Sequence, residues 1–230
     1  MEIMLSDILN KPVYFITGID TDCGKTAATG YLSKKLIEEG INCITQKLIQ
    51  TGCKEVSEDI AMHREIEGRP FLPVDADKTT CPLIYSYPCS PHMAIALDKK
   101  APEYDKTVKA TLDLLKLYDK VLIEGAGGLM VPLDGLFLTR DYILTHHIPV
   151  ILVTTAKLGS INHTLLNIEV LQNSGVDIEA VVYNTAICTD KLITEETRTY
   201  LKQYLAKKNP QIHWIELPDI RPLRNNAQYV

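Results

Sequence analysis

The stretch Val13–Thr26, VYFITGIDTDCGKT, constrains the fold of this chain more strongly than any other part of the sequence. Its first five residues, Val13–Thr17, are all β-branched or aromatic, which is typical of a buried strand. Turn-forming residues fill Gly18–Gly24, and an amphipathic helical segment opens at Lys25 and runs to Gly40. A strand, a glycine-bounded loop, Gly-Lys-Thr and a helix together form the layout of a phosphate-binding P-loop.

The chemistry of this loop suits an anionic ligand. Backbone N–H groups at a helix N-terminus point toward an anion, and the helix dipole favours negative charge there. Lys25 adds a full positive charge, and the Thr26 hydroxyl can ligate Mg²⁺. Five residues, Ile19–Cys23, separate the two glycines, whereas the usual spacing has four. An ordinary strand-to-helix turn is the alternative, but the flanking strand and helix favour nucleotide binding.

Composition places the chain among ordinary globular proteins. It has 230 residues, of which 46% are hydrophobic and 23% are charged, and this length suffices for one sizeable core. We therefore expect a single α/β domain, 1–230, with loosely ordered ends at 1–11 and 219–230. Lysine and arginine number 24 against 29 acidic residues. The net charge of −5 argues against nucleic acid or an anionic membrane as the main partner.

The sequence also predicts a cytoplasmic protein. No apolar run approaches the roughly 20 residues needed to span a bilayer. The first residues lack the basic and apolar regions of a signal peptide. The six cysteines include no Cys-x-x-Cys pair and no spacing typical of a zinc site, so we expect free thiols in a reducing compartment. Cys23 lies inside the phosphate loop, where a small space-filling side chain is the favoured interpretation.

Strands and helices alternate along the rest of the chain, with no repeat, linker or low-complexity block. This alternation predicts an α/β fold of the P-loop NTPase type, with a mostly parallel central sheet and helices on both of its faces. The segment 69–87 is rich in proline and is expected to be an irregular surface connection. The other expected strands are Ile41–Ile49, Val121–Ile123, Pro149–Thr155, Ala180–Asn184 and Ile212–Leu217, and expected helices include Ser57–Gly68, Asp105–Tyr118, Leu138–His147 and Thr194–Lys208.

Polar residues near the ends of these strands are candidate site residues. Lys47 lies near the carboxyl end of its strand, where ligands bind in open α/β sheets. We therefore favour a ligand-facing lysine over one that packs its stem at the sheet edge. Glu124 follows the strand Val121–Ile123 and precedes the glycine-rich Gly125–Gly128. An acid in this position holds Mg²⁺ in P-loop enzymes, and glycines let backbone approach a ligand. The pattern alone gives Asp59 only a helix-dipole role.

Several blocks of sequence, taken together and in order, resemble the ATP-dependent dethiobiotin synthetase family of biotin biosynthesis. The resemblance covers nearly the whole chain, and the spacing of five residues between the loop glycines is typical of this family. The blocks are GIDTDCGKT (Gly18–Thr26), KLIQTG (Lys47–Gly52), EGAGG (Glu124–Gly128) and KLGSINH (Lys157–His163), with Ser90-Pro91-His92 and a late Glu216-Leu217-Pro218.

This resemblance implies a homodimeric ligase with a mostly parallel P-loop sheet of about seven strands. Such an enzyme joins CO₂ to 7,8-diaminopelargonate with MgATP and forms dethiobiotin, ADP and phosphate. A carbamate on one substrate amine attacks the γ-phosphate. The second amine then captures the carbamic–phosphoric anhydride and closes the ureido ring.

The resemblance also implies a role for individual residues. Lys25 and Lys47 are the expected catalytic residues, and Lys47 offsets the repulsion between the carbamate and the γ-phosphate. The expected Mg²⁺ ligands are Thr26, Asp59 and Glu124. The expected ATP-binding residues are Asp22, Cys23, Gly24, Lys25, Thr26, Glu124, Gly125, Gly127 and Gly128, with Asn184, Glu216, Leu217 and Pro218 at the adenine. The expected substrate-binding residues are Thr21, Lys47, Thr51, Leu158, Gly159, Ser160 and Asn162, with the turn Gly159–Asn162 acting across the dimer interface.

Other proteins with a P-loop or a related fold remain as alternatives. An amidotransferase synthetase acting on a corrinoid usually carries a glutaminase domain, for which 230 residues leave no room. A partitioning-type ATPase favours an extra lysine early in the loop, and Gly18–Cys23 contains none. A plain dinucleotide-binding domain needs Gly-x-Gly-x-x-Gly after a strand, which this sequence lacks. One departure from the family pattern is the second block, where Leu48 and Thr51 stand in place of the common proline and serine.

Overall fold

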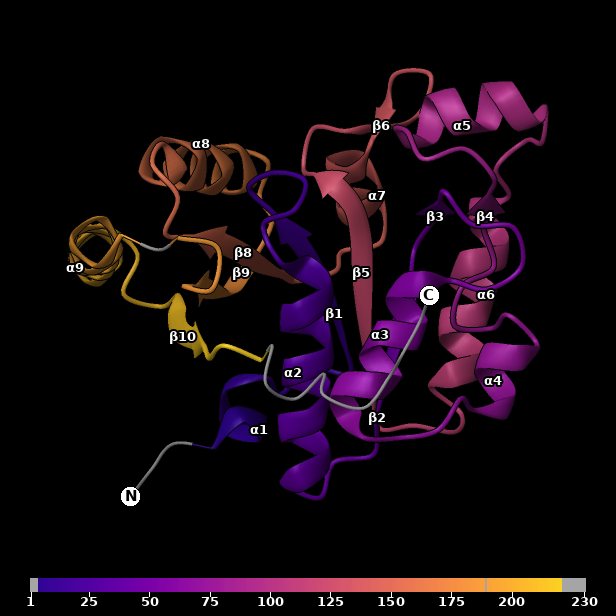
Figure 1. Cartoon of the computed structure of the whole chain (residues 1–230), viewed down its shortest axis with the longest axis horizontal. Helices are drawn as coiled ribbons and strands as arrows, with labels where there is room; N and C mark the ends of the chain where they lie inside the picture. The colour runs from indigo at the N-terminus through magenta and orange to yellow at the C-terminus, as the bar shows by residue number, and fades with distance from the viewer. Residues whose placement is uncertain (1–3, 189, 221–230) are drawn as a thin grey trace.

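Six parallel strands form the central sheet of the computed structural model, which describes residues 4–188 and 190–220. The sheet runs through the middle of the molecule, with helices on both sides (Figure 1). From one edge to the other the strands are β10 (His213–Leu217), β9 (Ile178–Asn184), β8 (Val150–Thr155), β1 (Val13–Gly18), β5 (Lys120–Gly128) and β2 (Cys43–Lys47).

The described part of this sheet has six strands where about seven were expected. The place beside β2 is taken by an irregular segment, in which the carbonyl of Thr80 accepts from the Lys47 N–H at 2.7 Å. This segment belongs to the proline-rich connection, and its short strand β4 (Ile84–Tyr85) pairs with β3 (Gln50–Thr51) in a separate sheet. The edge of β2 thus gains hydrogen-bond partners without a seventh strand.

Side chains alternate between the two faces of the sheet, as strand geometry requires. On β1, Ile16 belongs to a buried cluster with Leu32 on one face, whereas Phe15 packs against Tyr142 on the other. Helices α2 (Lys25–Glu38) and α3 (Glu58–Glu67) cover the first face, and α6 (Tyr104–Leu114), α7 (Thr139–Thr145) and α8 (Ser160–Asn173) cover the second, with α9 (Lys191–Lys208) beside α8. Further elements are α4 (Pro73–Ala76), α5 (Pro91–Asp98) and the antiparallel pair β6 (Pro132–Asp134) and β7 (Phe137–Leu138).

The first residues that the structure describes are packed, which differs from the loose order expected for 1–11. They form a short helix, α1 (Leu5–Ile8), and Leu9 is fully buried. The backbone N–H groups of Leu5 and Ser6 donate to the carboxylate of Glu39 at 2.8 and 2.7 Å. The expectation for 219–230 falls almost entirely outside the described residues. Within residues 4–188 and 190–220, no helix is both long enough and apolar enough to span a bilayer.

Parallel pairing brings the polar ends of β1, β2 and β5 to one edge of the sheet. The register pairs Lys47 of β2 with Glu124 of β5, and Gly18 of β1 with Gly128. Strand β5 continues past Glu124, where we expected it to end, because its glycines allow a neighbouring strand to approach closely. A Cβ atom on Gly125 would lie 2.8 Å from the ring of Phe15. Gly125 is therefore required by packing inside the sheet.

Candidate active site

The loop between β1 and α2 has a backbone conformation suited to an anion. Asp22 and Gly24 are left-handed, with φ of 57° and 96°, and Gly24 is the N-cap residue of α2. Among the described residues, no protein acceptor is paired with the N–H groups of Cys23, Gly24 and Lys25. Unpaired N–H groups at the start of a helix are a ready site for phosphate oxygens.

Two side chains hold the loop in this shape. Lys25 Nζ donates to the carbonyl of Asp20 at 2.9 Å, and the Asn184 amide donates to the carbonyl of Cys23 at 3.1 Å. Asn184 lies at the end of β9 and is buried. A Cβ atom on Gly24 would lie 2.2 Å from the Asn184 amide nitrogen. Position 24 therefore requires glycine for reasons of space as well as backbone angle.

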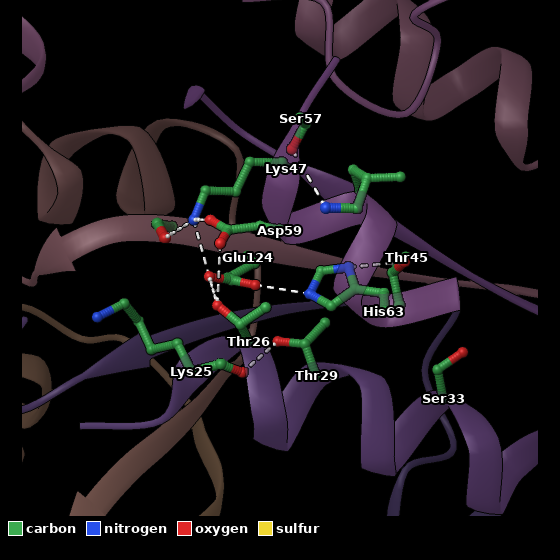
Figure 2. Close-up of polar contacts among 12 residues, drawn as sticks. Lys25, Thr26, Thr29, Ser33, Thr45, Lys47, Ser57, Asp59, His63 and Glu124 are labelled. Carbon is green, nitrogen blue, oxygen red and sulfur yellow. Dashed lines mark hydrogen bonds and ion pairs between the residues drawn. The ribbon is translucent and has the colours of Figure 1, made fainter. Parts of the chain in front are cut away.

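A cluster of charged side chains lies beside the loop, in which Lys47 and Glu124 are buried and Asp59 is half-buried (Figure 2). Lys47, at the end of β2, pairs with Glu124 of β5 at 2.7 Å and with Asp59 of α3. Its ammonium group also donates to the carbonyl of Gly125 at 3.1 Å. The Thr26 hydroxyl lies 3.0 Å from Glu124 Oε1 and 3.2 Å from Asp59 Oδ1. The structure thus brings together four predicted site residues from four separate elements.

Burial makes the charges of this cluster depend on one another. Lys47 is 4% exposed and Glu124 is 1% exposed. Burial opposes the positive charge of Lys47, but the carboxylates of Glu124 and Asp59 outweigh it and raise the pKa of Lys47. Burial likewise opposes the negative charge of Glu124, but the Lys47 ammonium and His63 hold the pKa of Glu124 well below its usual range. Removing one partner of such a pair costs about 3–5 kcal/mol, because the other charge is left uncompensated.

The oxygen atoms of Thr26, Asp59 and Glu124 fit a Mg²⁺ ion in their chemistry, since that ion prefers hard oxygen ligands. Within the described chain, no group of three or more His, Cys, Asp or Glu side chains is placed to hold a metal by itself. Two carboxylates and one hydroxyl leave coordination positions for waters and for phosphate oxygens of a nucleotide. This donor set therefore suits a metal that binds together with a nucleotide.

A cavity of about 370 Å³ opens between the loop, the charged cluster and the ends of β2 and β5. Its volume lies within the range of roughly 300–1,000 Å³ that small-molecule sites have. The predicted site residues that line it are Thr21, Asp22, Gly24, Lys25, Thr26, Lys47, Thr51, Asp59, Glu124 and Gly127.

A second cavity, of about 200 Å³, lies between the same loop and the start of α8. Gly159 is the N-cap residue of α8, with a φ of 93°. The hydroxyl of Ser160 is buried and has no hydrogen-bond partner among the described residues, which suits a polar ligand group at a helix N-terminus. Asn162 is exposed on the first turn of α8. The predicted residues that line this cavity are Thr21, Asp22, Cys23, Leu158 and Ser160.

Eight predicted residues lie outside the walls of these two cavities: Gly125, Gly128, Gly159, Asn162, Asn184, Glu216, Leu217 and Pro218. Gly125 and Gly128 lie within the sheet, as their register and packing require. Glu216, on β10, forms an ion pair with Arg198 at 3.2 Å. Pro218 is exposed just beyond the end of β10.

The end of β10 nevertheless reaches the same edge of the sheet as the loop. Leu217 of β10 pairs in register with Asn184 of β9, whose amide supports the loop. The predicted adenine residues therefore come from two adjacent strand ends.

Sequence reasoning missed a buried hydrogen-bonded chain that leads to Glu124. His63 Nε2 lies 2.7 Å from Glu124 Oε2, and His63 Nδ1 lies 3.0 Å from the Thr45 hydroxyl. Arg64 Nη1 donates to that hydroxyl at 2.9 Å. One signal was available, since His63 follows Asp59 by four residues and so lies on the same face of α3.

Known proteins resemble this chain over most of its length. The family model described as an AAA domain matches residues 13–213. The chain is 50% identical over 198 residues to ATP-dependent dethiobiotin synthetase BioD 2 of Pasteurella multocida, covering 86% of this chain and 93% of that protein. It is 45% identical over 203 residues to the protein of that name in Haemophilus ducreyi, covering 88% and 96%. It is 42% identical over 200 residues to dethiobiotin synthetase BioD of Chlorobaculum tepidum, covering 87% and 84%.

Among solved structures, the chain resembles a plasmid partition protein of Borrelia burgdorferi bound to AMPPNP. The TM-score is 0.51, over 94% of this chain and 90% of that one. At 17% identity, this likeness concerns the fold alone. Together with the observed sheet, it confirms the expected α/β fold of the P-loop class.

Proposed function

This chain belongs to the family of ATP-dependent dethiobiotin synthetases, and we propose that it catalyses the ring-closing carboxylation of 7,8-diaminopelargonate. The reaction consumes CO₂ and ATP and releases dethiobiotin, ADP and phosphate, so the protein is an ATP-dependent ligase of biotin biosynthesis. The observation that carries this proposal is the 42–50% identity to dethiobiotin synthetases over at least 84% of their length. The phosphate loop and the buried lysine beside it support the same activity.

The chemistry requires two anions to meet and react. An oxygen of the substrate carbamate forms a bond to the γ-phosphorus of ATP, and the bond from that phosphorus to the ADP oxygen breaks. The second amine then forms a bond to the carbamate carbon and loses a proton, and phosphate leaves with the oxygen that joined it to that carbon. The main tasks of the protein are to position the reactants and to stabilise their negative charge.

Lys47 and Lys25 carry out the electrostatic part of this work. Both line the 370 Å³ cavity, and their positive charges can offset those of a carbamate and a γ-phosphate placed between them. Two carboxylates and a backbone carbonyl fix the ammonium of Lys47 before any substrate binds. The raised pKa of Lys47 keeps this ammonium positively charged.

ATP binds with its phosphates on the loop and its base near the ends of β9 and β10. The unpaired N–H groups at the start of α2 and the Lys25 ammonium support the phosphate site. Asn184 supports the loop through the Cys23 carbonyl and lies beside Leu217, so it links the phosphate site to the adenine site. The residues of the proposed nucleotide site are Asp22, Cys23, Gly24, Lys25, Thr26, Glu124, Gly125, Gly127, Gly128, Asn184, Glu216, Leu217 and Pro218.

Thr26, Asp59 and Glu124 hold Mg²⁺ in this proposal. Their three oxygen atoms lie close together beside the loop, and the donor set leaves positions for phosphate oxygens. When bound, Mg²⁺ neutralises charge that develops on the phosphates.

The reacting end of the diamine occupies the 370 Å³ cavity, where Thr21 lines the wall. Thr51 and Lys47 face this end, and the turn 159–162 at the start of α8 receives the carboxylate of the diamine. A second copy of the chain supplies this turn, so the enzyme is a homodimer. The exposed side chain of Leu158, at 81%, is consistent with such an interface. The free cysteines fit a cytoplasmic location.

One assay tests this proposal. The protein is mixed with MgATP, bicarbonate and 7,8-diaminopelargonate, and dethiobiotin and phosphate are measured over time. We expect one phosphate for each dethiobiotin, and no phosphate above background without the diamine. Phosphate release that does not depend on the diamine would instead indicate an ATPase of another class, such as a partitioning-type ATPase.

A further inference from the structure

We propose that His63 is a positioning residue that sets the orientation of the Glu124 carboxylate. The inference rests on the proposed function, because it assumes that Glu124 ligates Mg²⁺ and pairs with the catalytic Lys47. His63 is fully buried and is absent from the walls of both cavities described above. Any influence of His63 on the reaction must therefore pass through Glu124.

The direction of each hydrogen bond follows from the chemistry of the donors. A guanidinium group can only donate, so the Thr45 hydroxyl accepts from Arg64 Nη1 at 2.9 Å. The single hydrogen of that hydroxyl then needs an acceptor. Among the described residues, the remaining partner of the hydroxyl is His63 Nδ1, at 3.0 Å. His63 Nδ1 therefore accepts, and His63 Nε2 carries the ring hydrogen and donates it to Glu124 Oε2 at 2.7 Å.

This chain of hydrogen bonds begins in a buried part of the fold that is rich in hydrogen bonds. Arg64 is 2% exposed and makes two hydrogen bonds of 2.9 Å to the carboxylate of Asp75. Asp75 in turn accepts from the Thr80 hydroxyl at 2.7 Å. Arg64 also contacts Glu67 on its own helix, at 3.0 Å. The hydroxyl of Thr45 thus receives a donor whose position is fixed by several carboxylate oxygens.

At the other end of this chain of hydrogen bonds, the two carboxylate oxygens of Glu124 make different contacts. Oε2 accepts from His63, whereas Oε1 lies 2.7 Å from Lys47 Nζ and 3.0 Å from the Thr26 hydroxyl (Figure 2). A carboxylate held at one oxygen cannot rotate freely, so the other oxygen stays directed toward Thr26 and Lys47. Loss of such supporting hydrogen bonds typically lowers metal affinity or activity by about 10–100-fold.

Two amide substitutions at position 63 test this role with matched chemistry. In His63→Gln the amide nitrogen reaches as far as Nε2 and can still donate to Glu124, whereas in His63→Asn it cannot. We expect His63→Gln to bind Mg²⁺ within about threefold of the unmodified protein, and His63→Asn to bind it at least about 10-fold more weakly. Binding is measured by calorimetry in the presence of a non-hydrolysable ATP analogue, and thermal unfolding is recorded for each variant.

Thr111→Val serves as the structural control. It removes a buried hydrogen bond of 2.6 Å between α6 and Gln46, the residue next to Thr45 on β2, and Thr111 has no hydrogen bond to Thr45, His63 or Glu124 among the described residues. We expect it to lower the unfolding temperature and leave Mg²⁺ affinity unchanged. Equal Mg²⁺ affinities for His63→Gln and His63→Asn would overturn the proposal, as would a loss of affinity in Thr111→Val as large as that in His63→Asn.

A spectroscopic measurement tests the hydrogen-bond directions without any metal or turnover. Nitrogen-15 NMR of the histidine rings, with the His63 signals assigned by their absence in His63→Gln, reports which ring nitrogen carries the hydrogen. We expect hydrogen on Nε2 and none on Nδ1, and hydrogen on Nδ1 would contradict the inference. If the protein made no dethiobiotin, the proposed function would fail, yet the NMR and calorimetry would still decide the role of His63.

Discussion

The two halves of the carboxyl edge of the sheet differ in how completely one chain builds them. On the β1–β5–β2 half, each of Lys47, Asp59 and Glu124 contacts charged or polar partners from other elements. On the β8 half, Leu158 is 81% exposed, and the Ser160 hydroxyl has no partner within the described residues. In the first half the charged groups are already paired in the absence of a ligand. In the second half the groups named are exposed or unpaired, so they are free to contact a ligand or a second chain.

This difference matches the demands of the proposed reaction. Stabilising two reacting anions requires charges that are already in place, because reorganising them during the reaction adds to the barrier. Holding a substrate tail requires only a site that closes when the substrate and a second chain are present. Substitutions in the first half should therefore change turnover, and substitutions in the second half should change substrate binding or assembly.

The largest effect is expected for Lys47→Gln. Removing one preorganised charge that stabilises a transition state costs about 10²–10³-fold in kcat, while ATP binding should change little. Steady-state kinetics and calorimetry with ATP measure the two effects. Lys35→Gln, which breaks an exposed ion pair with Glu38, is the control and should leave both unchanged. Equal losses of turnover and ATP affinity in Lys47→Gln would show that the two halves do not differ as proposed.

Glu124→Gln should have the next largest effect, on Mg²⁺. The amide keeps the size of the side chain but lacks the charge that attracts the metal, so we expect about 10–100-fold weaker Mg²⁺ binding. A Mg²⁺ titration in the presence of a nucleotide analogue measures it. The variant should also unfold at a lower temperature, because the Lys47 charge loses a buried partner. An unchanged Mg²⁺ titration would remove Glu124 from the metal site.

Ser160→Ala tests the β8 half of the sheet edge. A hydrogen bond to a charged ligand group contributes about 1.5 kcal/mol or more, so we expect roughly a 10-fold higher KM for the diamine with little change in kcat. Ser174→Ala, at the other end of α8, is the matched control. If Ser160→Ala lowered kcat and left KM unchanged, the β8 half would take part in the chemical step and would not serve only to bind the substrate.

The smallest effect is expected for Leu158→Ala, and it concerns assembly. Losing an apolar side chain at the rim of an interface should weaken the dimer by about 1 kcal/mol, or roughly fivefold. Sedimentation equilibrium measures the dissociation constant. Leu192→Ala, which truncates an equally exposed leucine on α9, is the control. A monomeric parent protein with full activity would contradict the proposed interface.

The sequence predicted which candidate site residues lie close together where spacing along the chain determines geometry. The strand, loop and helix of Val13–Thr26 carry their own signal in glycines, a lysine and a threonine at fixed positions. Lys47 and Glu124 were predicted because polar residues at the ends of parallel strands meet at one edge. The structure brings them into contact, since the register pairs these two residues.

What depends on packing between distant segments could not be predicted in the same way. The irregular segment at Thr80 takes the place of a seventh strand beside β2. Its sequence has no strand pattern that would predict this position. Asn184 was expected at the adenine, and its contact with the Cys23 carbonyl depends on how β9 lies beside the loop. Sequence reasoning did not distinguish His63 from the other residues of α3, because its hydrogen-bond partners lie on β2 and β5.

The most direct test of the account follows one oxygen atom. If a carbamate oxygen attacks the γ-phosphorus and phosphate later leaves with that oxygen, the phosphate must contain one oxygen from bicarbonate. Brief turnover with ¹⁸O-labelled bicarbonate, diamine and MgATP, followed by mass spectrometry of the phosphate, measures this transfer. We expect one labelled oxygen in each phosphate formed with dethiobiotin. Phosphate that carries oxygen from water instead would contradict carbamate phosphorylation at this site.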